Sequence, residues 1–161
     1  MDRDRYFMEL ALEEAKKGEK IWEVPVGCVI VKEGEVIAKA HNLKETRQNS
    51  IYHAEMLAIH EACQKLGSWR LDTCELYVTL EPCPMCAGAM MLSRLKRVVY
   101  GTPDPRAGCA GTLMNLLQDI RFNHRCEVIS GVLQEECSKI LVDFFKAVRA
   151  RIRQEKAAGK N

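Results

Sequence analysis

The sequence lacks several features that would place it in other classes of protein. None of its apolar runs approaches the roughly 18 residues that a membrane-spanning helix requires. Its start, Met1-Asp2-Arg3-Asp4-Arg5, has no apolar region of the kind found in a secretion signal. It also contains no internal repeat, linker or low-complexity segment. We therefore expect a cytoplasmic protein in which residues 1–161 form a single domain.

The cysteines do not indicate a disulfide framework. The chain has eight, but it lacks an export signal and is not small, with 161 residues of which 47% are hydrophobic and 29% charged. Only Cys83 and Cys86 have the spacing of metal ligands. We expect most of the others to be buried or partly exposed thiols without chemistry. These others are Cys28, Cys63, Cys74, Cys109, Cys126 and Cys137.

Positive charge gathers at the end of the chain, although the net charge is only +2. From Lys146 to Asn161 there are six basic residues and one acidic residue, a balance of 6 − 1 = +5. A basic tail from about residue 150 suits a polyanionic partner. The alternative is a solvated helix end whose cations are favoured by the helix dipole.

The hydrophobic pattern predicts alternating helices and strands. Helices are expected at 2–17, 54–66, 84–93, 113–118 and from 134 to about 154. Strands are expected at 26–31, 36–41, 75–80, 97–100 and 127–130. This order predicts one α/β domain, a five-stranded sheet with helices on its faces. The first two strands should form an antiparallel hairpin, and strands joined through helices should pair in parallel.

The pattern His53-Ala54-Glu55, followed by Pro82-Cys83-Pro84-Met85-Cys86, supplies three good zinc ligands. His53 and Cys83 each begin a predicted helix, and Cys86 lies one turn further on, so the three can converge. A structural zinc site normally has four protein ligands, whereas a catalytic site keeps one position for water. The count of three therefore favours hydrolytic chemistry, with Glu55 as the group that moves protons beside the metal.

Other interpretations of the same residues remain open. Cys83 and Cys86 alone could be a redox pair. A structural zinc site would need a fourth ligand from elsewhere, with Cys109, His41 and His60 as candidates. None of these three has paired ligand spacing.

The motif resembles the signature of the cytidine/nucleotide deaminase superfamily. The longer segments around Glu23–Gly27, His41-Asn42, Tyr77–Met90, Gly108–Met114 and Asn123–Arg125 resemble bacterial tRNA-specific adenosine deaminases. The resemblance implies a three-layer cytidine-deaminase-like fold and a mixed sheet. It also implies zinc held by His53, Cys83 and Cys86, and Glu55 as the proton shuttle. The implied reaction converts the wobble adenosine of an arginine tRNA to inosine in a homodimer.

The same resemblance places three residues around the flipped nucleoside. Asn42 should contact the nucleoside, Val26 should line the apolar wall, and Asp104 should lie near RNA at the mouth of the pocket. Taken without the resemblance, Asn42 could instead form a turn after the strand, and Asp104 could shape its loop between two prolines.

Two further positions bear on RNA contact. On the last helix Phe144, Phe145 and Arg149 could form a stacking and phosphate surface, although one phenylalanine is expected in the core. Tyr52, before the metal histidine, departs from the small residue common in the family. It could narrow the pocket rim, stack on a neighbouring base or pack outside the site.

Two rival functions remain. A free nucleobase or nucleoside deaminase acting on guanine or cytosine would use the same zinc chemistry. A zinc-stabilised RNA-binding module would lack turnover, but it gives no role to Glu55.

Overall fold

The structure is a computed structural model and describes residues 2–159, so Lys160 at the end of the basic segment lies outside it. Five strands form one sheet in the order β2-β1-β3-β4-β5. The strands are β1 (Gly27–Lys32), β2 (Glu35–His41), β3 (Cys74–Leu80), β4 (Arg97–Thr102) and β5 (Glu127–Ser130). β1 is antiparallel to both β2 and β3, whereas β3, β4 and β5 are parallel. The predicted mixed sheet is confirmed.

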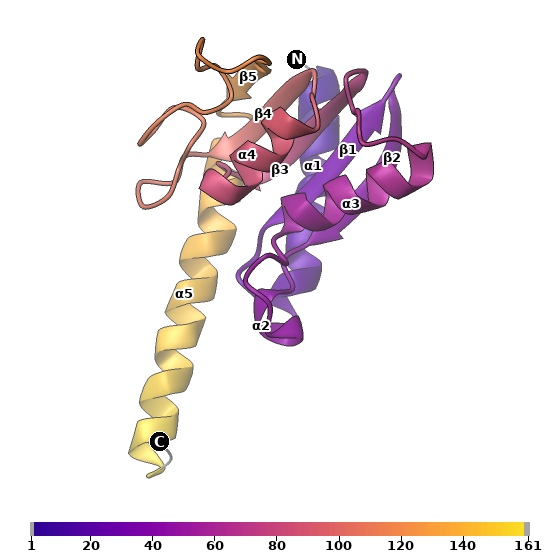
Figure 1. Ribbon diagram of the computed structural model, residues 1–161. Helices are drawn as coiled ribbons and strands as arrows, with labels where there is room; N and C mark the ends of the chain where they lie inside the picture. The colour runs from indigo at the N-terminus through magenta and orange to yellow at the C-terminus, as the bar shows by residue number, and fades with distance from the viewer. Residues whose placement is uncertain (1, 160–161) are drawn as a thin grey trace.

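Helices cover both faces of this sheet (Figure 1). The helices are α1 (Asp2–Glu19), α2 (Lys44–Arg47), α3 (Ala54–Leu66), α4 (Pro84–Leu92) and α5 (Gln134–Ala157). The faces separate because side chains alternate along a strand. In β1, Cys28 and Ile30 belong to the buried cluster that holds the inner residues of α3 and α4. Val29 and Val31 belong to the opposite cluster, with residues of α1 and α5.

Helix α3 approaches the sheet through small side chains. The sequence pattern predicts burial of Leu57, Ile59, Cys63 and Leu66, but these four remain only partly buried. The residues that face the sheet most closely are Ala54, Ala58 and Ala62, each with no exposed surface. Small side chains let the helix backbone pack close to the strands, so the deepest face of α3 is its alanine face.

The predicted helix at 113–118 is wrong. This segment consists of turns around a single bridge between Ala110 and Asn115. Its backbone donors bond to the preceding loop, as in the hydrogen bond from the Leu116 amide to the Cys109 carbonyl. Leu117 is buried, but Leu113 and Met114 are more than half exposed. The apolar residues therefore do not form one continuous helical face.

The last helix extends well beyond the sheet. Figure 1 shows the C-terminal half of α5 projecting away from the other elements. Phe144 is still buried, but every described residue from Arg151 onward is exposed. No helix within residues 2–159 is both long enough and apolar enough to cross a membrane.

Candidate metal centre and active site

The two halves of the cysteine–histidine motif meet at the starts of two helices. His53 is the N-cap residue of α3, and Cys83 is the N-cap residue of α4 with Pro84 directly after it. Cys86 lies in the first turn of α4 and is fully buried. Proline is favoured at the first helical position, because its missing amide hydrogen has no partner there in any case. The parallel β3 and β4 on either side of α4 fix where that helix begins.

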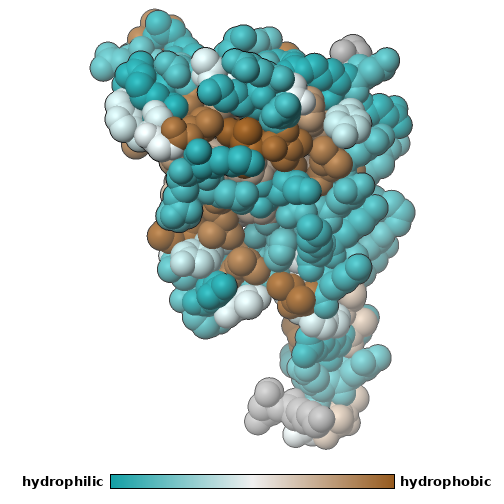
Figure 2. Space-filling view, turned by 90° about the vertical axis from the view of Figure 1, so that its right-hand side faces the viewer, coloured by the Kyte–Doolittle hydropathy of each residue, from teal (hydrophilic) through white to brown (hydrophobic). Residues whose placement is uncertain are grey.

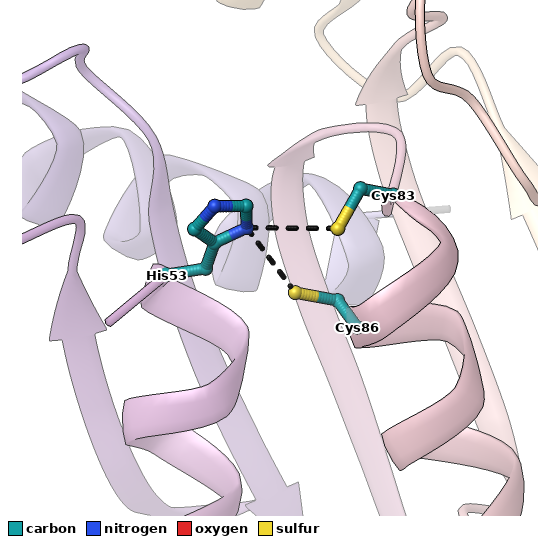
Figure 3. Close-up of side chains that lie close together, drawn as sticks. All are labelled: His53, Cys83 and Cys86. Atoms are coloured by element: carbon teal, nitrogen blue, oxygen red, sulfur yellow. Dashed lines mark hydrogen bonds between the residues drawn. The ribbon is translucent and has the colours of Figure 1, made fainter. Parts of the chain in front are cut away.

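The three side chains converge on one point (Figure 3). The Nδ1 atom of His53 lies 3.6 Å from the Cys83 sulfur and 3.5 Å from the Cys86 sulfur. Zinc bonded tetrahedrally to nitrogen and sulfur at their usual lengths separates those ligands by about 3.5 Å. The residues therefore fit a zinc ion with no change of side-chain position.

Without a metal the cluster holds protons that a metal must displace. The hydrogen bond from Cys86 lowers the pKa of Cys83 to about 4. Cys86 itself has a raised pKa, because it supplies that hydrogen bond and is buried. The hydrogen bond with Cys83 also raises the pKa of His53. Since the metal-binding forms are thiolate and neutral imidazole, metal binding should weaken as the pH falls.

The group is limited to three ligands. Within residues 2–159, His53, Cys83 and Cys86 form the only group of three or more side chains whose histidine, cysteine or carboxylate ligand atoms all lie within 4.8 Å of one another. Cys109, His41 and His60 lie outside the group. This arrangement leaves one position of a tetrahedron for a non-protein ligand, as in catalytic zinc sites.

Glu55 lies in the first turn of α3, close to the cluster but not in it. Its residue is only 4% exposed. Burial raises the pKa of its carboxyl to about 7, against the opposing effects of its own backbone amide and the nearby His53. A carboxyl of this kind can gain or lose a proton near neutral pH, as proton transfer requires.

Val26 precedes the β1–β2 hairpin and Asn42 follows it, so the two residues lie next to each other. The Asn42 backbone amide donates to the Val26 carbonyl at 3.1 Å. The Asn42 side chain accepts from the Lys44 amide at 3.1 Å and donates to the Val24 carbonyl at 3.3 Å. The turn role considered for Asn42 is therefore present. Val26 belongs to the same buried cluster as Cys86.

Asp104 shapes its own loop. Its carboxylate accepts from the backbone amides of Arg106 at 2.9 Å and Ala107 at 3.4 Å. Asp104 is partly exposed, so its carboxylate can still meet a ligand.

Glu81, which was not among the predicted site residues, holds this loop in place. Glu81 is 2% exposed, and its carboxylate accepts from the backbone amides of Asp104, Ala110 and Thr112 at 3.0 to 3.1 Å. It also accepts from the Thr112 hydroxyl. A charged residue directly after a buried strand was the available signal, since a carboxylate there needs several donors.

Glu23 is a second buried carboxylate that the sequence analysis overlooked. It has no exposed surface and accepts from the backbone amides of Glu45 at 3.1 Å and Thr46 at 2.6 Å. These amides belong to α2, so Glu23 ties that short helix to the segment before β1.

The two phenylalanines of α5 divide as expected. Phe144 is buried and Phe145 is 42% exposed, with their rings 5.4 Å apart. Arg149 is exposed one turn beyond Phe145. Tyr52 is partly buried, and its carbonyl accepts from the Leu43 amide. The structure does not bring Phe145 or Arg149 into the metal cluster.

Comparison with known proteins agrees with this architecture. The MafB19-like deaminase family matches residues 1–149. The three-layer arrangement is thus the cytidine-deaminase-like fold, and the site is that of a deaminase. The tRNA-specific adenosine deaminase of Bacillus subtilis (strain 168) is 60% identical over 161 residues, which is 100% of this chain and 98% of the relative. The chain belongs to the family of tRNA-specific adenosine deaminases.

Two solved structures are informative. One, from a study of A-to-I editing by tRNA:A34 deaminases at the wobble position of transfer RNA, superposes with a TM-score of 0.81. It is 40% identical and covers 84% of this chain and 99% of its own. The other, a guanine deaminase from Bacillus subtilis, is also 40% identical but covers only 66% of this chain and 69% of its own, with a TM-score of 0.60.

Proposed function

We propose that this protein converts adenosine to inosine at the wobble position of a tRNA anticodon, with an arginine tRNA as substrate. The observation that carries the proposal is the three-ligand cluster beside a buried carboxyl, in a chain 60% identical to a tRNA-specific adenosine deaminase. In this reaction water adds to C6 of adenine, the C6–N6 bond breaks, and the amino group leaves as ammonia. The chain acts as a single domain and, by its likeness to the family, as a cytoplasmic homodimer.

One zinc ion per subunit would be held by His53, Cys83 and Cys86. When bound, zinc lowers the pKa of water and so supplies a nucleophile at neutral pH. Glu55 would carry two protons from the attacking water in turn, the first to the ring nitrogen N1 and the second to the departing amine. The high pKa of the Glu55 carboxyl suits a group that must both accept and donate.

Asn42 and Val26 form the wall against which the adenine lies. Val26 supplies an apolar surface close to Cys86. The Asn42 amide has two donors and two acceptor sites, of which the turn uses one each. The remaining donor and acceptor are available to the nucleoside, so the turn and the binding role are compatible.

The RNA surface extends from the loop of Asp104 to the terminal helix. The partly exposed Asp104 suits a ribose hydroxyl, since a carboxylate would repel phosphate. Phe145 supplies a ring for stacking, and Arg149 supplies a cation for phosphate.

Incubation with an arginine anticodon stem-loop, followed by nucleoside analysis for inosine, tests this function. We expect inosine from the stem-loop and no ammonia from free guanine or cytosine. The opposite result would also be informative, because a guanine deaminase is among the similar structures. Ammonia from a free base, with the RNA unchanged, would replace the proposal with a nucleobase deaminase. Binding of RNA with no turnover would leave only an RNA-binding module.

A further inference from the structure

Helix α1 ends in a backbone arrangement that normally selects glycine. The Glu23 amide bonds to the Gly18 carbonyl at 3.0 Å, and the Trp22 amide bonds to the Glu19 carbonyl at 3.2 Å. This pair of bonds is the Schellman motif, in which the residue after the C-cap adopts the left-handed conformation. Here that residue is Trp22, with φ of 63°. A bulky side chain at positive φ is strained, and among residues 2–159 Trp22 is the only aromatic residue that adopts it.

Helix α3 ends in the same motif and provides a comparison within the chain. The Ser68 amide bonds to the Cys63 carbonyl at 3.2 Å, and the Gly67 amide bonds to the Gln64 carbonyl at 3.3 Å. The equivalent of Trp22 is Gly67, with φ of 61°. Helix α4 ends in the same motif with Arg94 at φ of 64°, so this fold also accepts side chains at the position. The backbone alone therefore does not explain why an indole stands at Trp22, and the explanation must come from what surrounds the ring.

The indole lies against the projecting helix. The Arg151 guanidinium carbon is 4.5 Å from the centre of the Trp22 ring, and the Phe144 ring centre is 6.3 Å from it. Trp22 nevertheless remains 45% exposed. Packing against α5 thus leaves nearly half of the side chain open, and this open part is available to a ligand.

The charges around the indole identify the kind of ligand. From residue 146 to residue 159 the exposed side chains carry a charge of 5 − 1 = +4, with Glu155 as the single acidic residue. The basic residues are Lys146, Arg149, Arg151, Arg153 and Lys156. From the side, hydrophilic and hydrophobic atoms lie beside each other on this projection (Figure 2). Aromatic rings among cations are the arrangement that binds single-stranded nucleic acid.

We propose that Trp22 stacks on an unpaired base of the substrate RNA while the basic residues of α5 contact the neighbouring phosphates. Trp22 and the basic residues of α5 thus form one surface that joins the end of α1 to the end of α5. The inference rests on the proposed function for the identity of the RNA. Trp22 leads directly into Glu23, which holds α2, and into Val24, which accepts from Asn42. A base on Trp22 would therefore be held on the same segment as the nucleoside pocket.

Tryptophan fluorescence tests the contact without any need for turnover. The chain has two tryptophans, and each has an arginine over its ring. The Trp69→Phe variant leaves Trp22 as the only reporter, and the matched Trp22→Phe variant leaves Trp69. On titration with the anticodon stem-loop, we expect saturable quenching in Trp69→Phe and a flat signal in Trp22→Phe. Formation of inosine with no change in Trp22 fluorescence would overturn the inference and leave the proposed function intact.

The Trp22→Gly variant separates stacking from folding. Glycine removes the backbone strain, so we expect a folded protein by circular dichroism. We expect KM for the stem-loop to rise about tenfold at unchanged kcat, the loss of one base–aromatic stack. Trp22→Tyr should recover most of the affinity, and Trp69→Gly should leave KM unchanged. An unchanged KM in Trp22→Gly would contradict the RNA contact. Quenching of Trp22 fluorescence that depends on protein concentration when no RNA is present would contradict it as well.

Discussion

Glu55 and Glu81 are both buried carboxylates near the metal cluster, and their surroundings give them opposite properties. Four hydrogen bonds from the loop reach Glu81, and those bonds lower the pKa of its carboxyl despite the burial. At Glu55 burial dominates and raises the pKa to about 7. Two carboxylates that are both almost inaccessible to solvent thus become an anion in one place and a proton carrier in the other. The hydrogen-bond donors around each carboxylate, weighed against its desolvation, decide its chemistry.

The comparison also assigns the two residues to different tasks. Glu81 holds the loop that carries Asp104, and the Cys109 amide of the same loop donates to the Pro82 carbonyl beside Cys83. Glu55 faces the ligands themselves, from the first turn of α3.

The largest effect is expected from Glu55→Ala. The variant should keep one zinc ion per chain, because Glu55 lies outside the ligand group. Its kcat on the stem-loop should fall by about 10²–10⁴, the usual contribution of general acid–base catalysis. Metal analysis and inosine formation provide the two measurements.

Cys86→Ala is the control for that experiment. It removes a ligand that is fully buried, so zinc and activity should be lost together and stability should fall. Loss of zinc from Glu55→Ala as well would mean that Glu55 is a ligand and not a proton shuttle.

Glu81→Gln should act on binding and stability and spare the chemistry. The amide keeps the shape but offers one acceptor oxygen in place of two, so some loop donors lose their partner. We expect a loss of about 2–3 kcal/mol in unfolding free energy. KM for the stem-loop should rise more than kcat falls, and zinc should stay bound. A fall in kcat as large as that of Glu55→Ala would remove the distinction between the two residues.

Gly108→Ala probes the same loop from the other side. A Cβ atom at this position would collide with the Glu81 carboxyl and the Asp104 carbonyl. We expect a loss of about 1–3 kcal/mol from overpacking, measured by thermal unfolding. Gly88→Ala is the matched control, because a Cβ there meets nothing within 4 Å. Equal unfolding temperatures for the two variants would show that the loop yields easily.

The pH dependence of stability should have opposite signs for the two carboxylates. The lowered pKa of Glu81 means that its stabilising contribution is complete above pH 4.5 and is lost as the pH falls below that value. The raised pKa of Glu55 means that, in zinc-free protein, its contribution declines as the pH rises from 4.5 to about 7. The measurement is the unfolding free energy of the wild type and of each variant, Glu81→Gln and Glu55→Gln, as a function of pH. The difference between wild type and each variant would show the two slopes. Slopes of the same sign would contradict the assignment.

Local pattern predicted most elements and the three converging ligands. Strands and long helices can be recognised from the spacing of their apolar residues and from helix-start residues such as Pro84. The helix prediction at 113–118 is wrong because the apolar residues of this segment belong to a turn-rich loop, which composition does not reveal. Glu23 and Glu81 were missed because their partners are backbone amides 22 to 31 residues away. The position of the Glu81 carboxylate after a strand is visible in the sequence, but backbone donors carry no sequence signal, so the contacts themselves emerge only from the fold.

The alanine face of α3 has a consequence for how this protein can vary. Ala58 and Ala62 touch no ligand, yet they set the distance between the sheet and the helix that carries His53 and Glu55. A valine at either position would push the helix outward and displace both functional groups together. A random-mutagenesis selection should therefore recover inactive clones at these alanines, far from any substrate contact. The tolerance of α3 to change is lowest where its side chains are smallest.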